Sequence, residues 1–332
     1  MSPRESRLPL NPEADEDSRQ ESHTSAEILP MGKGFTFEIT NNLSALLLNA
    51  YTPLRDDTAL PPLRMTAITN DSVATLLSTA YLHPPHAGTR AAAGIVAGTG
   101  TNATCLCPVS KLAADKRRNG ADAILMNTEW SINGTLPPLA PFRTAWDETL
   151  AARSEKPGFQ PFEEMVGGRY LGEIVRLVAV DLFSGGKTEL PRMLVTPYAV
   201  DTKLCSEVEG AASVDEVREM LAAYFGEAGL WPVESAQGFR EIASAVSDRA
   251  AALVAAATIG ALGVNDELAT WAEKIVVGYT GTVLERYWRF RERCQQFLDE
   301  LAGEGRVELV GTRDGGIVGA AVLAAMVEAG TT

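Results

Sequence analysis

The chain has 332 residues, with 29 Lys or Arg against 43 Asp or Glu and a formal net charge of −14. With 45% hydrophobic and 22% charged residues, its composition predicts a globular protein of one large domain or two modest ones. Binding to nucleic acid or to an anionic membrane requires clustered Lys and Arg, and no such cluster appears in the sequence. The charge balance therefore argues against both functions.

Histidines are few and lie early in the chain, at His23, His83 and His86. The last two flank Pro84-Pro85 in a predicted loop. A hydrolase with a catalytic histidine and a His-rich metal site are therefore disfavoured. We expect carboxylates to carry out any proton transfer.

The four cysteines do not form a zinc or disulfide pattern. Cys105 and Cys107 would point the same way on a strand, whereas Cys205 and Cys294 are isolated. Reduced, structural thiols in an intracellular protein are the favoured interpretation, with metal ligation by Cys105 and Cys107 as a minor alternative.

The most polar segment and the most apolar segment of the chain each give one prediction. Residues 1–28 are polar, acidic and poor in aromatic residues, which predicts a disordered tail without a signal peptide, and hence a cytoplasmic protein. The longest apolar run, 250–264, has 15 residues and is shorter than the roughly 20 that cross a bilayer. We predict a buried helix there.

In chain order, the first predicted elements are short. Residues 31–40 are predicted as a loop entering a strand, 43–51 as an apolar helix, 52–62 as a Pro-rich connection and 63–69 as a strand. Asn70-Asp71-Ser72 is predicted to cap a helix that ends near Tyr81, and 83–89 is a predicted loop.

The later elements alternate between strands and helices. Residues 92–97 and 103–107 predict a hairpin around a glycine turn at 98–102, and 123–126 predicts another strand. Residues 160–182 fit one amphipathic helix, with a break expected at Gly167-Gly168, and late strands are predicted at 274–277 and 306–310. This order predicts an α/β fold with helices on both sides of the sheet and a ligand site beyond the strand ends.

Several polar residues stand at predicted element ends, and each has a structural alternative. Asp71 suits a helix cap or a general base, Gly98–Asn102 a hairpin turn or a phosphate loop, and Glu129 a solvent-facing strand end or a ligand contact. Taken together they predict recognition of a polyhydroxylated ligand, because each sugar hydroxyl both donates and accepts hydrogen bonds. That set is Asn70, Asp71, Asn102, Glu129 and Glu163.

Seven motifs in a fixed order resemble the hexokinase/glucokinase family, most nearly its fungal glucokinase-like and hexokinase-like branch, over about residues 31–330. They are Met31-Gly-Lys-Gly-Phe35, Ile68-Thr-Asn-Asp-Ser-Val-Ala-Thr-Leu76, Gly98-Thr-Gly-Thr-Asn-Ala103, Met126-Asn-Thr-Glu-Trp130, Pro157-Gly-Phe-Gln-Pro-Phe-Glu163, Gly168-Arg-Tyr-Leu-Gly-Glu173 and Asp314-Gly-Gly-Ile-Val-Gly-Ala-Ala321.

The resemblance implies an actin-like ATPase (ribonuclease H-like) fold and transfer of the γ-phosphoryl of ATP, with Mg²⁺ bound through the nucleotide, to the 6-hydroxyl of a hexose. It implies that Asp71 is the general base, and that the sugar is held by Lys33, Asn70, Asn102, Glu129 and Glu163. It also implies nucleotide contacts from Gly98, Thr99, Gly100, Gly281, Thr282, Gly315 and Gly316.

The resemblance is incomplete at the N-terminal side. The family's first phosphate loop, of the Asp-Leu-Gly-Gly-Thr type, has no counterpart before Lys33. We therefore expect 29–70 to be a remnant of the small domain and 71–332 to be the large domain. The missing strands would expose a sheet edge, which predicts poor solubility or a protein partner that covers it. The alternatives to an active kinase are a catalytically weak or inactive sugar-sensing or regulatory protein and a truncated gene product.

Overall fold

The computed structural model describes residues 42–58, 60–84, 89–117, 120–132, 136–185, 190–226, 231–270, 274–312 and 314–330. The chain forms two units, one made of residues up to Thr69 together with those from Leu323, and the other of Asn70–Val322. The predicted tail at 1–28 and the loop and strand predicted over 31–40, with Lys33, lie outside the described residues.

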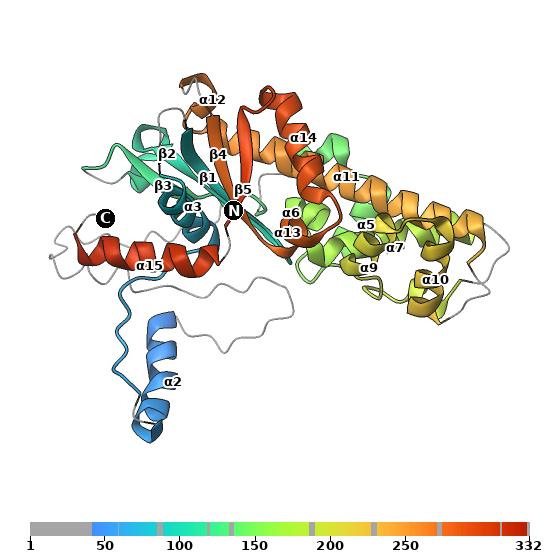
Figure 1. Cartoon of the computed structure of the whole chain (residues 1–332), viewed down its shortest axis with the longest axis horizontal. Helices are drawn as coiled ribbons and strands as arrows, with labels where there is room; N and C mark the ends of the chain where they lie inside the picture. The colour runs from blue at the N-terminus through green and yellow to red at the C-terminus, as the bar shows by residue number, and fades with distance from the viewer. Residues whose placement is uncertain are drawn as a thin grey trace, which may run out of the picture. The chain divides into compact units, whose positions relative to one another are not determined.

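A five-stranded mixed sheet forms the centre of the second unit, in the order β3-β2-β1-β4-β5 (Figure 1). Its strands are β1 (Thr89–Ala97), β2 (Thr101–Pro108), β3 (Ala123–Asn127), β4 (Lys274–Thr280) and β5 (Val307–Gly311). β1, β2 and β3 pair antiparallel, whereas β1, β4 and β5 pair parallel, so the carboxyl ends of these three strands share one edge. The predicted hairpin and the three other predicted strands of this region are confirmed.

Helix α3 (Asp71–Leu82) lies directly on one face of this sheet and contacts β1, β4 and β2. Gly94 of β1 pairs with Thr104 of β2 on one side and with Gly278 of β4 on the other. A Cβ atom on Gly94 would collide with the backbone of α3, and one on Gly278 with the Thr79 side chain. These two glycines therefore allow the close approach that brings the first turn of α3 over β2.

The opposite face of the sheet is buried against a layer of helices. Ala103 and Cys105 alternate with Thr104 along β2 and belong to the main hydrophobic core, which also contains residues of α7 (Gly168–Ser184) and α11 (Val233–Gly263). The Thr104 side chain instead contacts Ser72 of α3, so α3 and α11, which both contact β1 and β2, cover opposite faces. The predicted arrangement of helices on both sides is confirmed.

Most of the remaining helices of this unit lie in the region around α7 and α11, and the others lie beside the sheet (Figure 1). The predicted break in the helix over 160–182 is confirmed, since Gly167 is extended between α6 and α7. These helices are α4 (Leu136–Leu139), α5 (Ala145–Arg153), α6 (Pro161–Val166), α8 (Arg192–Val195), α9 (Thr202–Gly210), α10 (Val214–Phe225), α12 (Glu267–Thr270), α13 (Thr282–Arg286) and α14 (Phe290–Ala302), with 3-10 turns at Val109–Lys111, Ala114–Lys116 and Ala140–Phe142.

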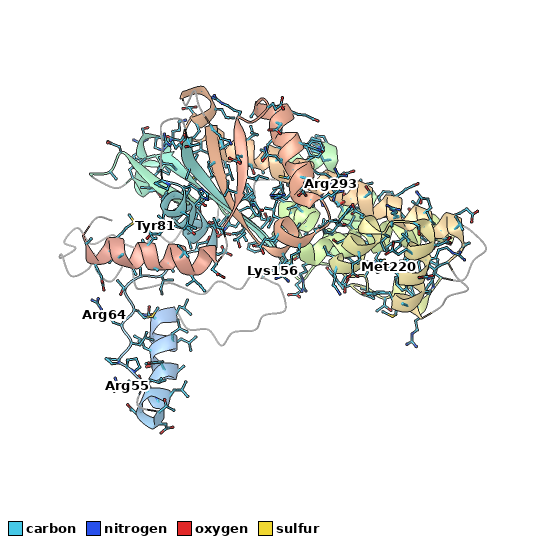
Figure 2. All side chains as sticks on the ribbon, viewed as in Figure 1. Arg55, Arg64, Tyr81, Lys156, Met220 and Arg293 are labelled. Carbon is cyan, nitrogen blue, oxygen red and sulfur yellow. The ribbon has the colours of Figure 1, made fainter. Side chains whose placement is uncertain are left out.

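Helix α11 contains the long apolar run that the sequence places in a buried helix. It has the length and hydropathy of a membrane span, yet 56% of its most apolar window is buried inside the unit. It packs against α14, α7 and α10. Arg293 of α14, labelled in Figure 2, donates to Asp248 of α11 at 2.9 Å and to Glu209 of α9 at 2.8 Å. Helix α11 is thus a core helix of this unit.

The first unit differs from the prediction in two places. Helix α2 (Leu43–Thr58) continues past residue 51 with Pro53 inside it, and the Thr52 hydroxyl donates to the Leu48 carbonyl at 2.8 Å. A proline removes one backbone donor, and the helix tolerates that loss here. The strand predicted over 63–69 is wrong, because no described strand pairs with it. Helix α15 (Gly315–Glu328) begins in the second unit and ends in the first.

Candidate active site

The first turn of α3 carries two of the predicted site residues. Asn70 is the N-cap, and its Oδ1 accepts from the Ser72 backbone N–H at 2.9 Å. Asp71 is the first helical residue, its side chain is exposed, and its Oδ1 accepts from the same N–H at 2.8 Å. Of the two roles left open for Asp71, the capping role belongs to Asn70. Asp71 is a carboxylate at the positive end of the helix dipole, where a negative charge is stabilising.

Two buried hydroxyl groups fix the orientation of the Asn70 amide. Because a backbone N–H can only donate, the Asn70 atom facing Ser72 is the oxygen. The Ser72 hydroxyl donates to that oxygen at 2.7 Å, so the Thr104 hydroxyl, 2.7 Å from Ser72 Oγ, donates to Ser72. Thr104 of β2 therefore holds Ser72, and Ser72 directs the amide nitrogen of Asn70 away from the helix.

Asn102 and Glu129 meet at the end of the hairpin. Asn102 Nδ2 lies 2.9 Å from Glu129 Oε1, 2.9 Å from Asn127 Oδ1 and 3.4 Å from Asn70 Oδ1. Asn127 Nδ2 donates to Glu129 Oε1 at 2.8 Å. These four side chains, from the first turn of α3, the start of β2 and the end of β3, form one hydrogen-bonded cluster.

Glu163 joins this cluster from α6. Its Oε2 accepts from the Thr101 backbone N–H at 3.0 Å, and its own N–H donates to Ser131 Oγ at 2.7 Å. The side chain is 2% exposed, which is rare for a carboxylate without a ligand-binding or structural role. Thr101 precedes Asn102 in β2, so this hydrogen bond places Glu163 next to the other members of the cluster.

Four of the five predicted sugar-binding residues are thus brought together, and Lys33 lies outside the described residues. Sequence reasoning missed Asn127, Thr104 and Ser131. Asn127 ends an apolar strand two residues before Glu129, and this position was a usable signal. Thr104 and Ser131 carry no signal of their own, because their roles depend on contacts with distant segments.

The glycine turn after β1 docks on the start of α7. The Gly98 and Thr99 carbonyls accept from the Gly168 and Arg169 N–H groups at 2.7 and 3.2 Å. Gly281 follows β4 with φ 109°, a value that favours glycine, and a Cβ there would collide with Ala97. The two turns are therefore back to back at the carboxyl edge of the sheet.

A pocket of about 640 Å³ lies beside these turns. Two predicted nucleotide contacts, Thr99 and Thr282, line it. The pocket is lined by three cationic residues, Arg169, Lys203 and Arg286, and by one acidic residue, Glu207. Such a lining suits an anionic ligand. The full lining is Thr99, Gly168, Arg169, Thr202, Lys203, Ser206, Glu207, Thr282, Val283, Arg286 and Tyr287.

The last predicted glycines begin α15. The Gly315 N–H donates to the Thr312 carbonyl at 3.1 Å, and Thr312 in turn donates to the Tyr279 carbonyl at the end of β4. Gly315 is buried, whereas Gly316 is exposed with open space where a side chain would be. Neither glycine lines the pocket beside the turns, and their predicted adenosine contacts stay predictions.

Burial raises the pKa of two groups near Glu163. It raises the pKa of the Glu164 carboxyl above its ordinary value, while the Ser154 hydroxyl and the Arg143 charge oppose that shift. Burial, followed by the charge of Glu163, raises the pKa of the Tyr170 hydroxyl. Tyr170 therefore stays neutral, and Glu164 takes up a proton at higher pH than an ordinary glutamate does.

None of the four cysteines belongs to this cluster. All four are free and buried, and Cys105 and Cys107 lie on the same side of β2, as predicted. Burial, with the nearby Cys107 and Glu267, raises the pKa of Cys105 to about 11, so its thiol is protonated at neutral pH. The described residues contain no group of three or more acidic, His or Cys side chains that could hold a metal ion.

The comparisons with known proteins agree with this geometry. A family model described as hexokinase matches residues 92–326, and a second hexokinase model matches residues 17–81. Hexokinase-1 of Oryza sativa is 32% identical over 79% of this chain and 53% of its own length. Glucokinase-1 of Saccharomyces cerevisiae is 29% identical over 92% of this chain and 66% of its own length.

Solved structures agree as well. A hexokinase from Schistosoma mansoni complexed with glucose has 28% identity and a TM-score of 0.78, covering 91% of this chain and 66% of that one. Another hexokinase structure has 25% identity and a TM-score of 0.70 over 89% of this chain and 61% of that one.

The fold is that of the actin-like ATPases, as expected from the sequence. The chain belongs to the hexokinase family. It spans about half the length of the plant relatives that it matches.

Proposed function

We propose that this chain transfers the γ-phosphoryl group of MgATP to the 6-hydroxyl of glucose or a related hexose, with Asp71 as the general base. Membership of the hexokinase family supports the reaction class. The glucose complex of the schistosome relative supports the hexose as substrate.

One observation carries the proposal: a single turn joins the polar cluster to the cationic pocket. Thr99 lines the pocket, and Asn102, three residues further on, belongs to the cluster. Three residues span at most roughly 10 Å. The pocket and the cluster are therefore neighbouring sites with the glycine turn between them, as transfer between two bound ligands requires.

The cluster suits a hexose because it offers both kinds of hydrogen-bonding group. Asn70 directs an amide nitrogen away from α3, while Glu129 and Glu163 provide carboxylate oxygens. A sugar hydroxyl donates one hydrogen bond to a carboxylate and accepts another from an amide. Sugars lacking one of these hydroxyls would leave a partly buried polar group unpaired, which is the basis of selectivity.

The chemistry requires one proton acceptor at the cluster. The hexose 6-oxygen attacks the γ-phosphorus, the bond from that phosphorus to the bridging oxygen breaks, and ADP leaves. The hydroxyl proton passes to the Asp71 carboxylate. Phosphoryl transfer depends on positioning and electrostatic stabilisation, so a site built on carboxylates and amides needs no histidine.

The pocket beside the glycine turns would receive the nucleotide. Arg169, Lys203 and Arg286 offer positive charge to its phosphates, and Thr99 and Thr282 offer hydroxyl groups. Mg²⁺ would arrive bound to the triphosphate, and its charge would lower the electrostatic cost of the transfer.

The domain assignment is also a proposal. We propose that 71–332 is the hexokinase large domain and that 29–70 belongs to the small domain. The division of the chain into two units between Thr69 and Asn70 supports this boundary, whereas the two family models match residues 17–81 and 92–326 and place the change further along the chain.

Asp71→Asn tests the proposed base. With glucose and MgATP, the wild-type chain is expected to form glucose 6-phosphate, and Asp71→Asn is expected to lower kcat by about 10²- to 10⁴-fold. Glucose binding, measured by calorimetry, should persist in the variant. Asp215→Asn is the matched control, because Asp215 also lies in the first turn of a helix, α10, and is exposed.

Three outcomes separate the interpretations. Unchanged turnover in Asp71→Asn would show that another group accepts the proton. Glucose binding without product in the wild type would contradict the kinase proposal and favour a sugar-sensing protein. Absence of both binding and product would contradict the proposed substrate class.

A further inference from the structure

Asn127 occupies a special place in the polar cluster although no role has been assigned to it. It is the last residue of β3 and pairs in register with Thr104 of β2. Its amide touches two proposed sugar contacts at once: Oδ1 accepts from Asn102 at 2.9 Å, and Nδ2 donates to Glu129 at 2.8 Å. Asn102 also donates to Glu129 at 2.9 Å.

The chemistry of the three groups fixes this triangle in one orientation. An ionised carboxylate only accepts hydrogen bonds, so both amides turn their NH₂ groups toward Glu129. The oxygen of Asn127 then faces the second hydrogen of the Asn102 NH₂ group. Both amide donors reach Glu129 Oε1, so Oε2 is the carboxylate oxygen offered to a ligand.

Glu129 needs such support because its backbone is strained. Its φ of 44° lies in the left-handed region, which costs a residue other than glycine on the order of 1–3 kcal/mol. The Thr128 N–H and hydroxyl both donate to the Ala103 carbonyl, at 2.9 and 2.8 Å, and anchor the backbone just before it. The side chain beyond that anchor is held by the two amides.

We propose that Asn127 is a positioning residue for hexose recognition, which orients the Glu129 carboxylate and the Asn102 amide without needing to touch the sugar. This inference rests on the proposed hexose-binding function. Loss of the Asn127 amide removes one of the two donors to Glu129 Oε1 and leaves Asn102 Nδ2 with the more distant Asn70 oxygen, at 3.4 Å, in place of the Asn127 oxygen at 2.9 Å. Each of the two sugar contacts then loses one of the hydrogen bonds that fix its orientation.

Asn127→Asp gives a test that a purely structural role would not satisfy. It sets a carboxylate 2.8 Å from Glu129 in place of a donor, and like charges this close raise the pKa of one of the pair. At pH 8 we expect the Kd for glucose to rise at least tenfold. As the pH falls toward 5, one shared proton restores an O–H···O contact between the two carboxyl groups, and the affinity for glucose should recover. The substitution leaves the other carboxylates of the proposed site, Asp71 and Glu163, in place.

Three further measurements complete the design. Asn127→Ala should weaken glucose binding to a similar extent at pH 8 and should show no recovery in acid. The melting temperature of both variants should stay close to that of the wild type, because Asn127 is exposed. Asn265→Asp is the matched control: Asn265 Nδ2 donates to Glu267 Oε1 at 2.8 Å with the same sequence spacing, and its replacement should leave the Kd for glucose unchanged.

A titration without sugar separates the two proposals. Carboxyl carbon NMR of Asn127→Asp should show a raised pKa for one member of the pair formed by the introduced carboxyl group and Glu129, whether or not glucose binds. If the wild type binds no hexose while this titration is as expected, the proposed function fails and the contact stands. Normal glucose binding in Asn127→Ala and in Asn127→Asp at pH 8 would overturn the positioning role.

Discussion

At the residue scale, the hydroxyl chain from Thr104 through Ser72 to Asn70 links the sheet to the proposed hexose site. Thr104 and Ser72 are fully buried, and each hydrogen has one acceptor. A buried chain of this kind holds an amide in one orientation better than solvent-exposed contacts would. The orientation of Asn70 therefore depends on a strand residue that does not reach the site.

Thr104→Val tests this dependence, because valine keeps the shape of threonine and removes its hydroxyl. It leaves Ser72 Oγ without its donor, which should lower the free energy of unfolding by about 1–3 kcal/mol. The Kd for glucose should rise several-fold. Thr258→Val in α11 is the control, since Thr258 is equally buried and bonds only within its own helix. Equal effects of both variants on the Kd would contradict the link.

At the element scale, α3 reaches the site because two glycines make room for it. Gly94→Ala would drive a methyl group into the backbone of α3 at Ser72 and Leu76. Overpacking of this kind should lower stability by about 1–3 kcal/mol and displace the first turn. Gly260→Ala in α11 meets no atom within 4 Å and should instead raise stability by about 0.5–1 kcal/mol. Urea denaturation and glucose titration of both variants measure the difference, and a tolerated Gly94→Ala would contradict the packing argument.

The helices and strands also show which parts of the fold can be predicted from the sequence. Helix α3, the hairpin and the break at Gly167 follow from local signals: a cap, a glycine turn and paired glycines. Two predictions were wrong: that the first helix ends at residue 51, and that 63–69 is a strand. Whether a helix tolerates Pro53, and whether a strand finds a partner, depend on the rest of the fold and not on the local sequence. In the site, Asn102 and Glu129 were predicted from their positions at element ends and again from the family resemblance. Asn127 stands two residues before Glu129, and its position was a signal that was missed. Thr104 and Ser131 act through contacts between segments that the sequence alone does not bring together.

At the scale of the whole molecule, the ion pair between Asp147 of α5 and Arg249 of α11 joins two helices of the large helical region. Its two hydrogen bonds are 2.7 Å each, and Asp147 also closes the capping box of α5 with Thr144. Burial alone would raise the pKa of Asp147, but the hydrogen bonds and charge of Arg249 outweigh it, with help from Thr144. The pKa is lowered from 3.8.

This shift predicts the acid dependence of stability. A carboxyl with a lowered pKa in the folded state stabilises the fold fully above its unfolded value of 3.8, and the contribution is lost as the pH falls through the folded value. Asp147→Asn should lower the free energy of unfolding at pH 7 by about 3 kcal/mol, because Arg249 loses its charged partner. Urea midpoints between pH 7 and 3 should fall less steeply for the variant than for the wild type. Parallel curves would show that Asp147 does not contribute.

The central claim is that the cluster of amides and carboxylates around Asn102 binds a hexose, and calorimetric titration of the chain with glucose tests it most directly. We expect saturable binding to the wild type, and a Kd raised at least tenfold in Asn102→Ala and in Glu129→Gln, while Asn265→Asp matches the wild type. Wild-type binding that survives both cluster substitutions, or no binding at all, would contradict the account.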